Sequence, residues 1–136
     1  AIPRAMTGID TNVLLRLLLR DDEAQFGRLV AEIEAGAWAD GVLVNSVVLV
    51  EAVWVLTKTL GRPKAEVVTF IDDLLSTDGL TVQFESAVVR ALSKWRTAKC
   101  DFADCLIAEI NVDAGATTTL TFDVDALKLP DFSPVP

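Results

Sequence analysis

The sequence predicts an α/β fold, in which helices cover both faces of a central parallel sheet to give a three-layer α/β/α sandwich. Short apolar or β-branched segments, typical of strands, alternate with longer segments whose apolar residues recur at helical spacing. Strands that are separated by helices are joined by crossovers, and such crossovers connect parallel strands. The 136 residues match the size of one domain with a substantial core.

Four segments are expected to be strands, namely residues 7–9, 41–44, 80–84 and 117–122. The second is apolar after its glycine, which is typical of a strand buried on both faces. The third alternates apolar and polar residues, and the fourth is rich in threonine.

Helices are expected between these strands, over residues 11–20, 21–36, 47–60, 64–76, 86–99 and 101–114. Thr11 or Asn12 can cap the first helix, and Asn45 or Ser46 can cap the third. Glycines follow several of the helices, as is common at helix ends. Residues 125–129 and the proline-rich end of the chain are expected to form a turn and a loose end.

One domain is predicted, covering residues 6–130. Residues 1–5 precede Met6 and are interpreted as a remnant of an expression vector, and residues 131–136 as a C-terminal tail. The longest apolar run, 42–56, is interrupted by polar residues and is too short to span a bilayer. Asp10 and Arg16 interrupt the N-terminal apolar stretch, which does not fit a signal peptide, so a cytoplasmic location is expected.

The composition is 51% hydrophobic, with a mean hydropathy of +0.42. That excess of apolar residues favours self-association or a protein partner that covers part of the surface. Cys100 and Cys105 are interpreted as buried small hydrophobic residues on different sides of one helix.

The chain contains no histidine, which excludes a Ser-His-Asp triad, a Cys-His pair, a histidine-rich zinc site and a histidine general base. Its net charge of −8 argues against a broad basic face for nucleic acid, but not against a substrate held by local cations and a metal. Metal chemistry with oxygen ligands, or acid–base catalysis by carboxylates, therefore remains.

Four acidic residues, Asp10, Glu51, Asp104 and Asp123, lie at the ends of apolar segments or inside them. A buried core would bring such carboxylates together, and gathered carboxylates repel one another unless they are protonated or bind a cation. Asp10 and Asp123 follow predicted strands, and sites in parallel sheets form beyond the carboxyl ends of the strands. The sequence therefore predicts a metal site.

Each acidic residue also has a structural interpretation. Asp10 can satisfy free amides at a helix N-terminus, and Glu51, inside an apolar helix, can form a buried pair with an arginine. Asp101 and Asp104 share one helix face, where Asp101 is expected to cap the helix or support the site and Asp104 to belong to the site. Asp125 follows Asp123 and is an ordinary loop residue or a further ligand.

Other charged residues are expected to be solvated. Residues 21–23 and 72–73 lie among polar helix positions. Arg16 and Arg20 are one turn apart and can project past Asp10 toward a phosphate or an inhibitor, although a solvated stripe is the preferred interpretation.

The stretches GIDTNVLLRLL, VVLVEAVWVL, DFADCLIAE and TLTFDVDAL, in this order and spacing, resemble a PIN-domain ribonuclease, specifically a VapC-type toxin of a toxin–antitoxin pair. The resemblance extends from Met6 to Leu129. It implies an α/β/α sandwich, a homodimer, and Mg²⁺ or Mn²⁺ bound by acidic residues. It also implies a VapB-type antitoxin whose tail enters the active-site groove.

The resemblance assigns roles by position. It implies a catalytic, metal-binding quartet of Asp10, Glu51, Asp104 and Asp123, with Asp125 as a further metal ligand. Polar residues would support that site, namely Thr11, Asn12, Ser46 and Thr121. Asp101 is a further supporting residue because it shares a helix face with Asp104. The implied function is metal-dependent endoribonuclease activity as the toxin of a type II pair, with RNA hydrolysed to a 5′-phosphate and a 3′-hydroxyl.

Three alternatives remain. A PIN-like scaffold would bind a partner without cutting RNA. A phosphatase of the haloacid-dehalogenase type would carry a second aspartate two residues after Asp10, where this chain has Asn12. A receiver domain would carry adjacent acids at the end of its first strand and a later strand-end lysine, and neither is evident.

Overall fold

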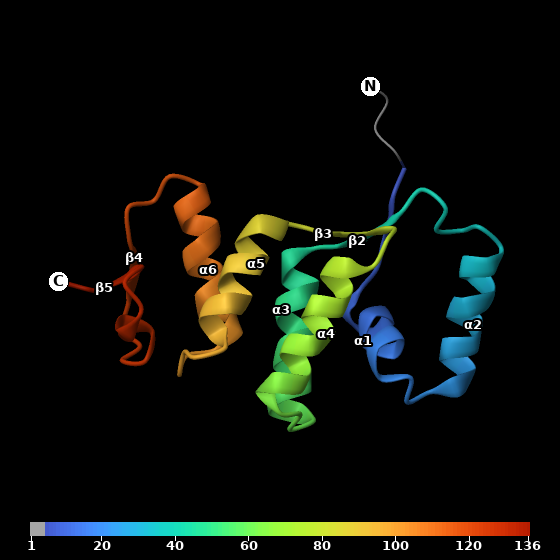
Figure 1. The fold of residues 1–136 in the computed structure, drawn as a ribbon, viewed down its shortest axis with the longest axis horizontal. Coiled ribbons are helices and arrows are strands. Elements are labelled where there is room, and N and C mark those ends of the chain that lie inside the picture. Colours follow the sequence, from blue (N-terminus) through green and yellow to red (C-terminus); the bar gives the residue numbers. More distant parts are fainter. Residues whose placement is uncertain (1–4) are drawn as a thin grey trace. The chain divides into compact units, whose positions relative to one another are not determined.

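The computed structural model describes residues 5–136, so the interpretation of the first five residues falls almost entirely outside the described part of the chain. Its contacts divide the chain into two compact units, Ala1–Gln83 and Phe84–Pro136, which are described separately below (Figure 1). Over the described residues, no helix combines the length and the hydrophobicity needed to cross a membrane.

The first unit contains a three-stranded parallel sheet in the order β1-β2-β3. The strands are β1 (Thr7–Gly8), β2 (Val42–Val44) and β3 (Leu80–Val82). Val42 lies opposite Thr7 on one side and Leu80 on the other. The predicted parallel arrangement is confirmed, although each strand is shorter than its apolar segment.

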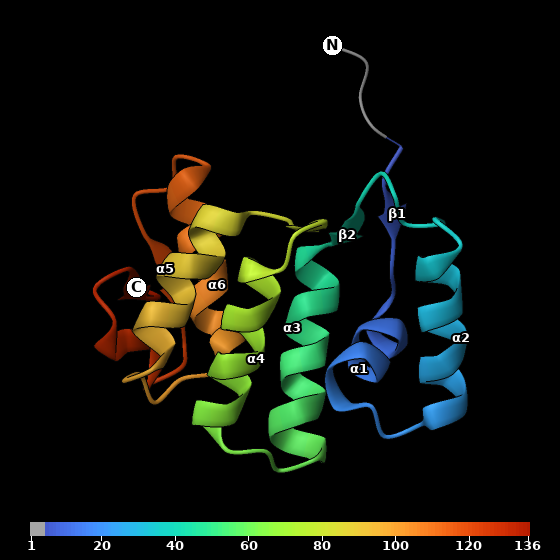
Figure 2. The ribbon, with the colours of Figure 1, turned by 45° about the vertical axis from the view of Figure 1, so that its right-hand side comes forward.

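Four α-helices accompany these strands, namely α1 (Thr11–Leu19), α2 (Glu23–Glu34), α3 (Ser46–Trp54) and α4 (Lys64–Ser76). The π-helical turn η1 (Val55–Thr59) continues α3, where the sequence predicts one uninterrupted helix. α3 and α4 run side by side in Figures 1 and 2. Leu49 of α3, Leu56 of η1 and Val67 of α4 are fully buried and belong to the core of this unit.

The residues that cap α1 and α3 can be compared with the predicted caps. The cap of α1 is Asp10 rather than Thr11 or Asn12, because the Asp10 carboxylate accepts a hydrogen bond from the Val13 amide at 3.0 Å. Asn45, one of the two candidates for α3, caps that helix. Aspartate and asparagine present an acceptor at the distance that the free amides of the first turn require.

The second unit contains α5 (Glu85–Trp95) and α6 (Phe102–Asp113), followed by β4 (Thr119–Thr121), the 3₁₀ turn η2 (Ala126–Lys128) and β5 (Phe132–Pro134). α5 ends before the predicted residue 99. The two helices pack together through Trp95 and Phe102, whose rings meet edge to face with centroids 5.5 Å apart.

The expectation of a loose C-terminal tail is wrong. β5 pairs in parallel with β4, with Thr119 opposite Phe132, and the two form a two-stranded sheet of their own. The Thr119 amide donates to the Asp131 carbonyl at 3.0 Å, and the Phe132 side chain is buried. Proline is tolerated here because an edge strand need not donate from every residue.

Candidate active site

Asp10 lies at the carboxyl edge of the first sheet. It lies two residues after the end of β1 and is exposed, and its carboxylate closes the first turn of α1 by accepting from Val13. Only one carboxylate oxygen is occupied by this hydrogen bond, so the other remains open to a cation. The cap therefore orients Asp10 without using up its capacity to bind.

The neighbouring strand ends carry polar side chains at the same edge. Asn45 follows β2 and accepts from the Val48 amide at 2.8 Å. Gln83 follows β3, and its side-chain oxygen accepts from the Ser46 amide at 3.0 Å, while its own amide donates to the Val44 carbonyl. The predicted supporting residue Ser46 is thus held through its backbone by Gln83, a residue that the sequence analysis missed although it follows a strand.

Glu51 lies on α3 and is exposed, which differs from the buried setting expected for an apolar helix. Val47 and Trp54 lie one turn before and one turn after it and are 71% and 57% exposed. α3 therefore presents an outward face on which Glu51 sits between apolar side chains. Within residues 5–136 the structure gives Glu51 no ion pair, so the alternative of a buried pair with an arginine is wrong.

Asp101 and Asp104 form a capping box at the start of α6. The Asp101 side chain accepts from the third amide of the helix, and the Asp104 carboxylate accepts from the Asp101 amide at 3.3 Å. The predicted capping role of Asp101 is confirmed. Burial is the largest cause that raises the pKa of Asp104, and the charges of Asp123 and Asp101 raise it further.

Asp123 follows β4 in the same unit, and its neighbours hold it in place. Its amide donates to the Thr121 hydroxyl at 3.0 Å, and its carboxylate accepts from the Asp125 amide at 2.8 Å. The Asp125 carboxylate itself pairs with Lys128 at 3.1 Å. Asp123 is thus positioned by the two predicted residues nearest to it, whereas Asp125 already has a cationic partner.

The two cysteines are buried, as expected, but they do not lie on different sides of a helix. Their sulfur atoms are 3.8 Å apart, because Cys100 precedes α6 and Cys105 lies in its first turns. A contact between the residue before the cap and the fourth helical residue is a hydrophobic staple, which here fixes the start of the helix that carries Asp104. Burial raises the pKa of the Cys100 thiol, which keeps it protonated.

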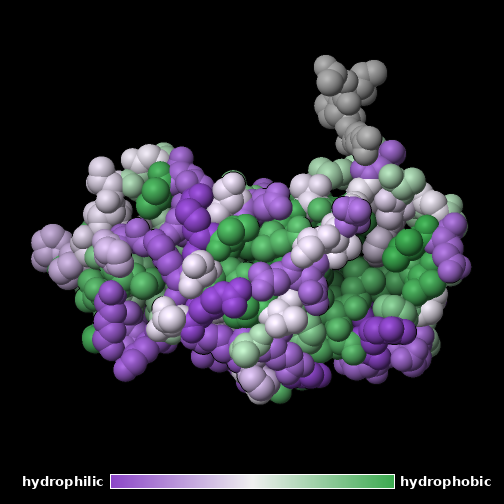
Figure 3. Space-filling view, viewed as in Figure 1, coloured by the Kyte–Doolittle hydropathy of each residue, from purple (hydrophilic) through white to green (hydrophobic). Residues whose placement is uncertain are grey.

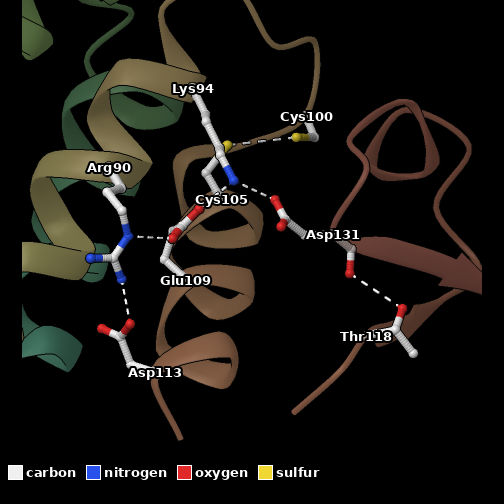
Figure 4. Close-up of polar contacts among 8 residues, drawn as sticks. All are labelled: Arg90, Lys94, Cys100, Cys105, Glu109, Asp113, Thr118 and Asp131. Atoms are coloured by element: carbon white, nitrogen blue, oxygen red, sulfur yellow. Dashed lines mark hydrogen bonds and ion pairs between the residues drawn. The ribbon is translucent and has the colours of Figure 1, made fainter. Parts of the chain in front are cut away.

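A buried ion network in the second unit was missed by the sequence analysis. Glu109 on α6 is 3% exposed, and its carboxylate accepts from the Arg90 guanidinium at 2.7 Å and pairs with Lys94 (Figure 4). Lys94 also binds Asp131 next to β5, and Arg90 also binds Asp113. Burial lowers the pKa of Lys94, but its bonds to Asp131 and Glu109 outweigh that effect and raise it. The network ties α5, α6 and the segment before β5 together.

The predicted carboxylates are divided between the two units, Asp10 and Glu51 in the first and Asp104 and Asp123 in the second. Among the residues that the structure describes, no group of three or more acidic or cysteine side chains is close enough to hold a metal ion. Within the second unit, Asp104 and Asp123 nevertheless suit a hard cation, because both are carboxylates and the charge of Asp123 already raises the pKa of Asp104. A cation would remove that repulsion.

Comparison with known families matches the chain to the PIN domain over residues 9–131. No curated protein and no solved structure matches the chain. The matched region covers most of the chain, contains all four candidate carboxylates, and agrees with the observed helices and parallel strands. The chain therefore belongs to the PIN-domain family, whose members are generally nucleases that use divalent metals.

Proposed function

We propose that this protein is a metal-dependent endoribonuclease that acts in the cytoplasm as the VapC-type toxin of a type II toxin–antitoxin pair. The observation that carries the proposal is the PIN-domain match over residues 9–131, which spans the four carboxylates in the predicted order. The absence of histidine supports it as well, because a chain without that residue needs another means to activate water.

Asp10, Glu51, Asp104 and Asp123 would hold Mg²⁺ or Mn²⁺, with Asp125 as a further ligand once it leaves Lys128. A bound divalent cation would lower the pKa of water and neutralise charge that develops on the phosphodiester. The residues around these carboxylates position them. The α1 cap orients Asp10, the capping box and the cysteine staple place Asp104, and Thr121 holds the backbone of Asp123.

The remaining predicted residues would support the site at its edges. Thr11 and Asn12 follow Asp10 in the first turn of α1, and Ser46 begins α3, the helix that carries Glu51. Because these residues lie at helix starts, their polar groups are near the ends of β1 and β2.

A protein partner is supported by the exposed apolar surface. Phe122 and Val124 flank Asp123 and are 86% and 72% exposed. In the first unit, an apolar groove of about 510 Å³ lies between α4, α1 and α2, and Figure 3 shows hydrophobic surface over that region, on the right of the view. Surfaces of this kind are covered in working proteins, which favours a homodimer and a VapB-type antitoxin. The net charge of −8 suits a basic antitoxin tail.

The test is cleavage of total tRNA and of structured RNA by the purified chain with Mg²⁺, with Mn²⁺ or with EDTA. We expect products that carry 5′-phosphates, and only when a metal is present. Asp104→Asn should abolish cleavage, whereas Asp113→Asn, which removes an exposed acid from the same helix, should leave it unchanged.

Two results would contradict the proposal. Cleavage that persists in EDTA would show that no metal site is used. A folded chain, free of antitoxin, that cuts no RNA under any condition would favour the PIN-like scaffold without catalysis.

A further inference from the structure

A groove of about 420 Å³ lies between α1 and α2 in the first unit, with Asp10 in its lining. The two helices lie next to each other in Figures 1 and 2. Its polar lining includes Asn12, Gln25, Arg28 and Glu32. The groove therefore joins Asp10, one of the proposed metal-binding carboxylates, to Gln25, Arg28 and Glu32, to which the proposed function assigns no role.

The two arginines that the sequence offered for a phosphate are already engaged. Arg16 donates to the Gln25 side chain at 2.6 Å and pairs with Asp21. Arg20 lies over the Phe26 ring, 4.2 Å from its centroid. Both arginines brace α1 against the start of α2, so neither guanidinium is available without breaking that contact.

Arg28 differs from them. It is exposed, it lies one helical turn beyond Gln25 on α2, and it lines the groove that Asp10 also lines. In the described part of the chain, the structure records no hydrogen bond or ion pair for its guanidinium. Because Arg16 occupies the Gln25 side-chain oxygen, the Gln25 amide group that remains is a donor. Arg28 and Gln25 thus offer donors and a positive charge at the same groove.

We propose that this groove binds the backbone of single-stranded RNA, with Arg28 contacting a phosphate that neighbours the scissile one. The inference rests on the proposed ribonuclease function and names the substrate contact of that site. A chain with a net charge of −8 repels RNA at long range, so productive binding depends on the few cations beside the carboxylates. The planar guanidinium matches two phosphate oxygens at once, which gives Arg28 more than the effect of its charge.

Glu32 should weaken the contact between Arg28 and a phosphate. It lies one turn after Arg28 on α2 and lines the same groove, where its charge opposes an incoming phosphate. Neutralising either residue should therefore change the RNA affinity of this groove, in opposite directions. Removing the charge of Arg28 should weaken RNA binding, and removing the charge of Glu32 should strengthen it.

The experiment measures binding of a short fluorescein-labelled single-stranded RNA of random sequence, by anisotropy in Mg²⁺, with Asp104→Asn in every chain to prevent cleavage. Arg28→Gln should weaken binding by about five- to tenfold and reduce the slope of log K against log salt by about 0.7, the value for one phosphate on a single strand. Glu32→Gln should tighten binding by about twofold. Arg62→Gln removes an exposed arginine of the same unit that pairs with Glu66, and it should change neither quantity.

In otherwise wild-type chains, Arg28→Gln should raise KM for RNA cleavage and leave kcat nearly unchanged. Unchanged affinity and salt slope in Arg28→Gln, with a wild-type chain that cuts RNA, would overturn the inference and leave the ribonuclease proposal standing. A wild-type chain that neither binds nor cuts RNA would overturn both. Binding of an acidic peptide that depends on Arg28, with RNA binding unaffected, would assign the groove to a protein ligand instead.

Discussion

Glu109→Gln should destabilise the second unit far more than any substitution of an exposed charge there. The Glu109 side chain is 3% exposed, accepts a hydrogen bond from Arg90 and forms an ion pair with Lys94. Glutamine keeps the shape but removes the charge, and its amide group must face one of the two cations with a donor. The free energy of unfolding should therefore fall by more than the lost charge attraction alone, because a buried polar group is left facing an unsuitable partner.

The magnitude follows from burial. A hydrogen bond to a charged group contributes about 1.5–3 kcal/mol, against about 1 kcal/mol for a neutral one, and a buried group left facing the wrong partner adds a further cost. We expect Glu109→Gln to lower the free energy of unfolding by about 2–4 kcal/mol. Lys94 and Arg90 keep Asp131 and Asp113 as partners, which limits the loss to the part that depends on Glu109.

Trp95 provides the assay, because it is buried in the second unit against Phe102. With Trp38→Phe and Trp54→Phe in the background, its fluorescence reports the unfolding of this unit alone in urea. A loss of about 2–4 kcal/mol should move the midpoint by about 1–2 M at an ordinary slope. Asp113→Asn, at the exposed end of the same network, is the matched control and should move it little.

Two results would refute this reasoning. The first is a Glu109→Gln midpoint that is indistinguishable from that of the parent chain. The second is an Asp113→Asn shift as large as that of Glu109→Gln, because the cost would then not come from burial.

Four further outcomes are expected. Asp104→Asn removes a charge beside Asp123, so calorimetry should show Mg²⁺ affinity reduced by about tenfold or more. The substitution keeps an oxygen that can accept from the Asp101 amide, so urea unfolding should show no loss of stability. Because the folded chain raises the pKa of Asp104, the metal-free protein should lose stability as the pH rises from the ordinary value of 3.8 through the raised pKa, and Asp104→Asn should remove that slope. Folding also raises the pKa of Lys94, so the stability contributed by its charge should be fully present below pH 10.5 and be lost as the pH rises through the folded pKa. Urea unfolding of the wild-type protein and of Lys94→Met over a series of alkaline pH values tests this. Asn45→Ala removes the cap of α3 and should cost about 1 kcal/mol in urea unfolding, whereas equal stability would show that the Val48 amide finds another acceptor.

The order of helices and strands was predictable because the signals for it are local. Apolar periodicity, β-branched runs and glycines act within a few residues, and they located the strands that became β1 to β4. The acidic quartet was predicted in the same way, since each member interrupts or ends an apolar run, and its role as a metal site stays a prediction. The PIN-domain match over residues 9–131 agrees with that order.

Other features depend on which surfaces meet, and the sequence pattern did not show them. α3 is apolar almost all round, yet Glu51 and Trp54 face outward because the core covers only part of the helix. Residues 131–136 have the composition of a loose end, yet Phe132 and its neighbours pair with β4. At the C-terminal segment, ladder hydrogen bonds and the burial of Phe132 outweighed local propensity.

The sequence by itself determined the fold class, the family and the carboxylates that make a metal-dependent nuclease the best hypothesis, because these follow from residue types in a fixed order. Only the tertiary structure decided which charges are already satisfied. It joined Glu109 to Arg90 and Lys94, engaged Arg16 with α2, and left Arg28 open on the groove beside Asp10. The physical reason is that the state of a charge depends on its partners in space, and those partners lie up to 37 residues away along the chain.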